Sequence, residues 1–79
     1  MKKLVEVLAK SLVDFPDEVV VKETEDNNTV NLELVVNPED MGKIIGKHGR
    51  IAKAIRTILK STAMKQNKRA NLEIIDKWK

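Results

Sequence analysis

Periodic hydrophobic residues divide the first half of the chain into one helix and two strands. Between residues 4 and 13, apolar residues recur every three or four positions, which predicts an amphipathic helix. Pro16 disfavours a helical conformation for the residue before it, so we expect the helix to end there. A β-branched strand then begins at Val19, and apolar residues alternate with other residues over 30–36, the pattern of a strand with one buried face. Residues 26–28 favour a turn, so the two strands are predicted to form an antiparallel hairpin.

The second half predicts two helices and a final strand. Asn37-Pro38 can cap and open a helix, which Gly46 and Gly49 then interrupt. A second helix is expected from Arg50 to about residue 66, and residues 70–75 form a strand. The order α-β-β-α-α-β predicts an α+β fold, in which the helices pack on one face of a three-stranded sheet. On the second helix, Ile51, Ile55, Ile58, Leu59 and Thr62 lie along one side, and Arg50, Lys53, Arg56 and Lys60 cluster on the roughly opposite side.

Charge is divided unequally between the two halves of this 79-residue chain. The first 40 residues carry four lysines and ten acidic residues, whereas residues 41–79 carry eleven basic and two acidic residues. No acidic residue occurs between Asp40 and Glu73. A basic half of this kind is typical of a protein that binds a polyanion, although a solvated basic helix would give the same pattern.

The segment Ile44-Ile45-Gly46-Lys47-His48-Gly49-Arg50 carries the most specific information. Two glycines three positions apart, between two helices, allow a tight turn with positive φ angles and leave room for another backbone. The helix that follows offers free N–H groups and the positive end of its dipole to an anion. Lys47 and Arg50 add positive charge, so we expect a cradle for a sugar-phosphate backbone. The alternative is that Gly46 only caps a helix and Gly49 is an ordinary loop residue.

This segment resembles the I-I-G-x-x-G signature of KH domains, and the predicted order of elements is similar to the type II, or bacterial, KH topology. Residues 37–50 also resemble the small stand-alone bacterial KH proteins of the KhpA family. The resemblance treats residues 1–79 as a single KH domain with its G-x-x-G turn at 46–49. KH domains hold about four nucleotides of single-stranded nucleic acid. The resemblance therefore implies a non-catalytic protein that binds single-stranded RNA.

The resemblance also implies which residues contact RNA. Lys53 lies one turn beyond the glycine turn, where it would extend the contacts with phosphates. For Arg56 and Lys60, contact with phosphates and simple solvation are equally supported. His48 is expected to be exposed or to touch the ligand. The implied RNA-binding residues are Ile45, Gly46, Lys47, His48, Gly49, Arg50 and Lys53.

The apolar residues near the turn leave the groove for the bases undefined. Ile45 and Ile51 are candidates for the groove floor or for the core behind it. Ala52 stands where many KH motifs have a larger aliphatic residue. Phe15 and Trp78 are the only aromatic residues, and neither is near the turn in sequence, so recognition by base stacking is not expected.

Partners follow from the resemblance as well. It implies an RNA chaperone or post-transcriptional regulator that forms a homodimer, or a heteromer with a second KH protein of the KhpB kind, in connection with cell elongation and division. Ala54, Ile58, Ser61 and Thr62 could form a symmetric contact, although Ile58 and Thr62 could equally belong to the core. Two other interpretations stay open: a protein-interaction scaffold with a KH fold, and a binder of single-stranded DNA.

Other classes of protein are disfavoured by the sequence. A phosphate-binding loop of the nucleotide-hydrolase type needs a longer glycine loop that ends in Gly-Lys-Ser/Thr. His48 is the only histidine and has no orienting partner nearby in sequence, and the chain has no cysteine. We therefore expect no catalytic residues, no metal and no cofactor. No long apolar run follows Met1, so a cytoplasmic protein without a membrane segment is expected.

Overall fold

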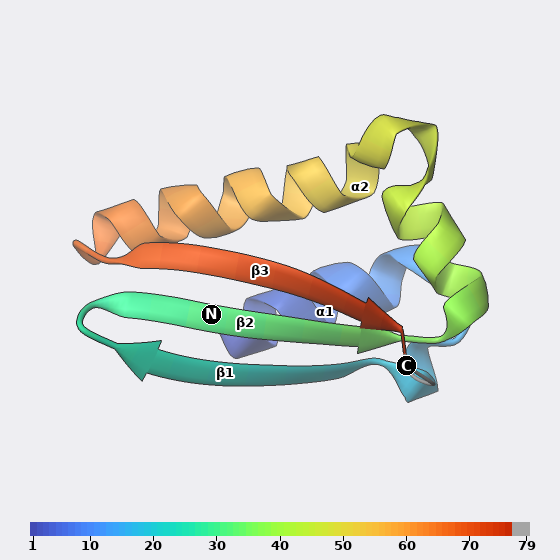
Figure 1. Cartoon of the computed structure of the whole chain (residues 1–79), viewed down its shortest axis with the longest axis horizontal. Coiled ribbons are helices and arrows are strands. Elements are labelled where there is room, and N and C mark those ends of the chain that lie inside the picture. Colours follow the sequence, from blue (N-terminus) through green and yellow to red (C-terminus); the bar gives the residue numbers. More distant parts are fainter. Residues whose placement is uncertain (77–79) are drawn as a thin grey trace.

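The elements of the fold follow the predicted order with one addition. The computed structural model describes residues 1–76, without the side chain of Lys47. The sheet has the order β1-β2-β3, with β1 antiparallel and β3 parallel to β2. The predicted α+β fold is confirmed, and a short 3-10 helix, η1, is added after the first helix. The elements are α1 (Lys2–Leu12), η1 (Pro16–Glu18), β1 (Val20–Asp26), β2 (Thr29–Val36), α2 (Pro38–Lys65) and β3 (Arg69–Asp76) (Figure 1).

A two-residue turn joins β1 and β2. Asn27 and Asn28 have φ angles of 50° and 64°, and Asp26 pairs with Thr29 across the hairpin. Asparagine tolerates left-handed backbone better than most residues. Two such residues in succession suit the turn whose twist matches that of the flanking strands. The predicted hairpin is therefore confirmed.

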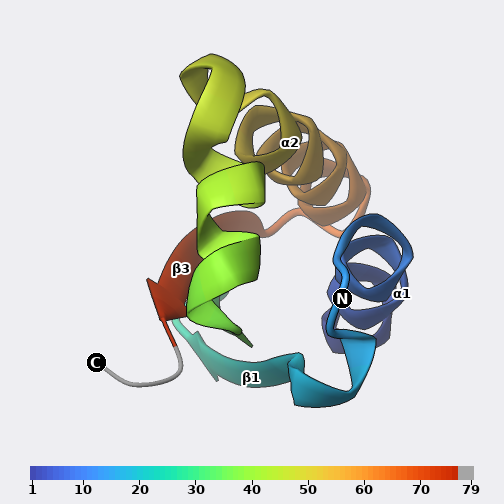
Figure 2. The same cartoon turned by 90° about the vertical axis from the view of Figure 1, so that its right-hand side faces the viewer.

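The sheet has one face covered by helices, as predicted, and one open face (Figures 1 and 2). The hydrophobic residues at 30, 32, 34 and 36 of β2 are at most 1% exposed. They pack with Val5 and Ala9 of α1 and with Ile55 and Leu59 of α2 in one core. This burial drives the docking of both helices onto the sheet.

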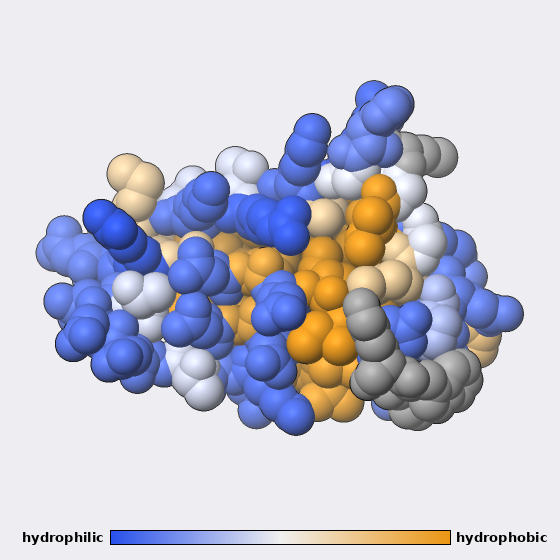
Figure 3. All heavy atoms as spheres, in the orientation of Figure 1, coloured by the Kyte–Doolittle hydropathy of each residue, from blue (hydrophilic) through white to orange (hydrophobic). Residues whose placement is uncertain are grey.

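The open face consists of the alternate residues of each strand, and most of its surface is hydrophilic (Figure 3). Its hydrophobic part lies toward the ends of β2 and β3, where the register aligns Val20, Val35 and Ile75 across the three strands. The residues that form the open face are 20, 22, 24 and 26 of β1, 29, 31, 33 and 35 of β2, and 69, 71, 73 and 75 of β3.

Helix α2 bends at His48 and Gly49, whose φ angles are 62° and 70°. These values belong to the left-handed region, which a right-handed helix does not contain. Helix α2 therefore consists of a first arm, residues 38–47, and a second arm, residues 50–65, which run in different directions (Figure 2). The expected positive φ is present at Gly49 but not at Gly46, where the prediction is wrong because Gly46 continues the first arm.

The buried carboxylate of Asp40 anchors the first arm. Its two oxygens accept hydrogen bonds from the backbone N–H groups of Asp14 and Phe15, at 2.9 and 3.0 Å. Asp40 is 0% exposed. At the start of the same arm, the side chain of Asn37 accepts a hydrogen bond from the N–H of Glu39 at 2.8 Å. The two hydrogen bonds of Asp40 tie the arm to the loop after α1 and so hold the bend in place relative to the sheet.

The substitution Asp40→Ala should lower the free energy of unfolding by about 3 kcal/mol, because two backbone N–H groups lose a charged acceptor. Urea denaturation measures the change. Glu39→Ala is the matched control, since Glu39 lies in the same helical turn but is exposed. The control should lose less than about 1 kcal/mol. Equal losses would show that charge at the helix terminus, and not the buried hydrogen bonds, carries the effect.

Alanine at the two glycines of the turn should affect stability in opposite directions. A Cβ atom at Gly46 or Gly49 would meet no atom within 4 Å, so only the backbone conformation matters. Gly49→Ala should cost about 1–2 kcal/mol, since alanine disfavours a positive φ. Gly46→Ala should stabilise the protein by up to about 1 kcal/mol, because alanine favours a helix. Thermal unfolding checks both, and a destabilised Gly46→Ala would contradict the helical conformation of Gly46.

Candidate nucleic-acid interface

The bend of α2 leaves backbone accessible where side chains would otherwise cover it. At Gly42, Gly46 and Gly49, an added Cβ would meet no other atom within 4 Å. Packing within the chain therefore does not require glycine at these positions. Backbone conformation requires it only at Gly49, and glycine in a helix costs about 1 kcal/mol relative to alanine. Gly46 thus leaves room for the close approach of a ligand.

The second arm of α2 begins at this accessible point. Its start lies next to Gly49, where the N–H groups that begin a helical arm can face an anion. The positive end of the helix dipole at the same place favours an anion. The side chains of His48 and Arg50 are exposed. The bend thus brings together the features that the sequence predicts for a phosphate cradle, while the side chain of Lys47 lies outside the described residues.

The apolar residues around the bend divide between core and surface. Ile44 is 0% and Ala52 is 4% exposed, so both belong to the core. Ile51 is half-buried and packs against that core. Ile45 is 49% exposed and is the apolar side chain of the predicted set that a ligand can reach most easily. The small residue at Ala52 is therefore explained by packing.

The cations of the second arm are exposed, and the ion pairs among the described residues do not include them. In residues 1–76, the ion pairs join the N-terminus to Glu23, Lys43 to Asp14 and Lys68 to Glu25. Arg50, Lys53, Arg56 and Lys60 take part in none of them, so their charges are available to an anion.

Lys43, on the first arm, has a different role. The hydrogen bond that it donates to Asp14 raises its pKa above the ordinary value of 10.5, and the charges of Asp14, Asp40 and Glu39 add to this effect. Lys43 is therefore charged at neutral pH but already partnered by an acid. An anion therefore gains less from contact with Lys43 than from contact with the cations of the second arm.

A groove runs between the second arm and the edge strand β3. Two adjoining hollows, of about 200 and 270 Å³, form it. Arg56 and Lys60, which the sequence left undecided, lie on its α2 wall. The β3 wall was not predictable from the sequence, because nothing in the pattern indicated that β3 pairs in parallel with β2 at the edge beside α2. The lining residues are Arg56, Leu59, Lys60 and Met64 of α2, together with Lys68, Arg69, Ala70, Asn71 and Leu72.

A separate hollow of about 520 Å³ lies between the two arms and the end of α1. Gly46 and Ile51 border it, so the bend is accessible from this side as well. Its other lining residues are Leu12, Glu39, Gly42 and Lys43.

Two further features of the described residues concern metals and membranes. Nowhere in residues 1–76 do three or more His, Asp or Glu side chains gather into a group suited to a metal ion. The helices of the same region are too short or too polar to cross a membrane.

Known proteins place the chain in a family. The family model described as the KH domain of KhpA/KhpB matches residues 2–74. The RNA-binding protein KhpA of Clostridium acetobutylicum is 63% identical over 75 residues, which cover 95% of this chain and all of that protein. Its counterpart in Halalkalibacterium halodurans is 53% identical over 76 residues, which cover 96% of this chain and all of that protein. For Aquifex aeolicus KhpA, 51% identity extends over 76 residues, 96% of each chain. No solved structure matches the chain significantly.

These relatives are named as RNA-binding proteins, which confirms the prediction that the chain is not an enzyme. The family model covers both arms of α2, the bend and most of β3. The chain therefore belongs to the KhpA/KhpB family of KH domains.

Proposed function

We propose that the chain is a single, cytoplasmic KH domain that binds single-stranded RNA, with the RNA backbone at the bend of α2 and the strand along the groove. The open space at Gly46, next to the start of the second arm, is the observation that carries this proposal. The names of the relatives support the choice of RNA as the ligand.

The spacing of the exposed cations supports the path of the strand. Arg50, Lys53, Arg56 and Lys60 extend over ten residues of the second arm, or about 15 Å at about 1.5 Å per residue. Four stacked nucleotides extend over a similar length, at about 3.4 Å each. A KH domain clamps about four nucleotides. The phosphates would thus follow the second arm away from the bend.

The cellular role that we propose is that of an RNA chaperone or post-transcriptional regulator, acting on cell elongation and division with a KhpB-like partner. The match to a family model shared by KhpA and KhpB supports the partner. Ile58 supports self-association: the sequence placed it on the apolar side of its helix, yet it is 39% exposed. Thr62 is half-buried and donates a hydrogen bond to the carbonyl of Ile58 at 2.9 Å. A homodimer would link two RNA sites and raise the effective affinity.

The double substitution Lys47→Asp/His48→Asp should lower the affinity for a single-stranded RNA octamer at least tenfold, since two added carboxylates repel the phosphates. Aspartate tolerates a positive φ, so the fold should persist. Fluorescence anisotropy and crosslinking measure the loss, and circular dichroism confirms the fold.

The matched control is Lys3→Asp/Lys10→Asp, which makes a similar charge change on exposed positions of α1. Unchanged binding by the turn variant would defeat RNA binding at the turn, and a failure of the unaltered protein to bind RNA would favour the protein-interaction scaffold. A DNA octamer of the same sequence tests the alternative of a single-stranded DNA binder. Equal affinity for the RNA and the DNA octamer would indicate a protein that binds single-stranded nucleic acid in general.

The double substitution Arg56→Gln/Lys60→Gln should weaken the salt dependence of RNA binding. Three or four phosphate contacts predict a slope of about −2 to −3 in log K against log salt, and each lost contact removes about 0.7. The variant's slope should therefore be smaller in magnitude by about 1.4. Lys3→Gln/Lys10→Gln removes the same charge from α1 and should leave the slope unchanged. Similar changes in both variants would mean that net charge, and not contact in the groove, attracts the RNA.

A further inference from the structure

The two walls of the groove differ in chemistry at the level of Arg56. The α2 wall carries the cations Arg56 and Lys60, whereas the β3 wall there consists of Ala70, Asn71 and Leu72, none of which is charged. A single strand that follows the cations places its phosphates toward α2. Its bases then turn toward β3, because phosphates and bases lie on opposite sides of a nucleotide. This orientation rests on the RNA binding proposed above.

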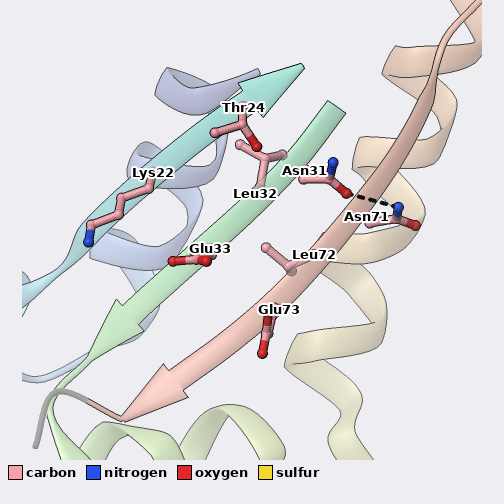
Figure 4. Close-up of a pocket in the computed structure, with 8 residues that line it drawn as sticks. All are labelled: Lys22, Thr24, Asn31, Leu32, Glu33, Asn71, Leu72 and Glu73. Atoms are coloured by element: carbon pink, nitrogen blue, oxygen red, sulfur yellow. Dashed lines mark hydrogen bonds between the residues drawn. The ribbon is translucent and has the colours of Figure 1, made fainter. Parts of the chain in front are cut away.

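Charge on the open face reinforces this orientation. Glu33 and Glu73 are paired in the register of β2 and β3, and both border the hollow of about 310 Å³ on the open face (Figure 4). Lys22 pairs with Glu33 in the register of β1 and β2 and lines the same hollow, so two carboxylates and one ammonium group leave a net negative charge, which disfavours phosphates. The RNA backbone is therefore disfavoured beyond the edge of β3, so the RNA presents its bases to this edge.

Asn71 lies at the border between the groove and the open face. Both hollows of the groove and the hollow of the open face include it in their lining. Among the described residues that line these three hollows, Asn71 alone borders all of them. It is exposed and is the uncharged polar side chain of the β3 wall.

A neighbouring amide orients the side chain of Asn71. Its Nδ2 donates a hydrogen bond to Oδ1 of Asn31, its partner in the register, at 3.1 Å (Figure 4). This bond uses one of the two N–H groups of Asn71. The Oδ1 atom points away from Asn31, toward the side of α2 (Figure 4). The amide therefore keeps an acceptor and a donor free, with their positions set before any ligand binds.

We propose that Asn71 reads the edge of a base in the groove, with adenine preferred. A free amide pairs with an edge that offers a donor beside an acceptor, as asparagine does with N6 and N7 of adenine. Adenine presents such a pair on both its Watson–Crick and its Hoogsteen edge, whereas cytosine and uracil present one on the Watson–Crick edge alone. Asn31 acts as a positioning residue, because it fixes the direction of the amide.

Binding of fluorescent A8, C8 and U8 RNA to the full chain tests this role by anisotropy. The unaltered protein should bind A8 more tightly than U8. Asn71→Ala should lose affinity for A8 about five- to tenfold, the lower part of the range for a bidentate base contact, and should change U8 by less than twofold. Asn31→Ala should lose part of the A8 preference while it keeps U8 binding. Thr24→Ala is the control, because Thr24 pairs with Asn31 on the same face of the sheet but lies on β1, the strand farthest from the groove.

The alternative to this role is an ordinary cross-strand amide pair, which would affect stability alone by about 0.2–1 kcal/mol. An unchanged ratio of A8 to U8 affinity in Asn71→Ala, or an equal loss for all three RNAs, would overturn the inference and leave RNA binding intact. The absence of an A8 preference in the unaltered protein would overturn it too. Failure of the unaltered protein to bind any of the RNAs would overturn the proposed function, and this inference with it.

Discussion

The arrangement of the candidate binding surface depends on one buried carboxylate. Asp40 receives two backbone N–H groups from the loop after α1, and through them it fixes where the first arm of α2 leaves the sheet. The bend at His48 and Gly49 then sets where the second arm returns over the sheet. The groove exists because the returning arm lies beside β3. An acidic side chain far from any phosphate thus determines where the phosphates are expected to bind.

The two chemistries of the groove have separate origins in the chain. The cations stand on a helix whose other side is anchored by Ile55 and Leu59 in the core, so their spacing is that of a rigid scaffold. The polar group of the opposite wall stands on a strand that pairs with β2 along its length. The side chains proposed to bind phosphates and to recognise bases therefore stand on two elements that pack on the same core.

Most elements of the fold could be predicted from the sequence, because the local patterns are strong. Alternation in β2, the Asn27-Asn28 turn and the capped start at Asn37 specify their elements through short-range effects alone. The bend at Gly49 was likewise predictable, since a positive φ and a glycine coincide there.

The features that could not be predicted depend on contacts between segments that are distant in the sequence. The parallel pairing of β3, the partners of Asp40 and the exposure of Ile58 arise only once the elements pack together, which periodicity does not encode. Gly46 differs, because its helical conformation shows that the bend does not require a glycine at this position.

The short connection between the second arm and β3 gives the groove a fixed length. Helix α2 ends at Lys65 and β3 begins at Arg69, and the N–H of Lys68 is bonded to the carbonyl of Ala63 at 2.9 Å. The groove is therefore closed at this end, where its two walls meet, and open at the end near the bend. A strand longer than the groove must leave it near Met64, which is 74% exposed. In the proposed mode of binding, the groove therefore holds a few nucleotides, and the rest of a longer RNA extends beyond it on either side.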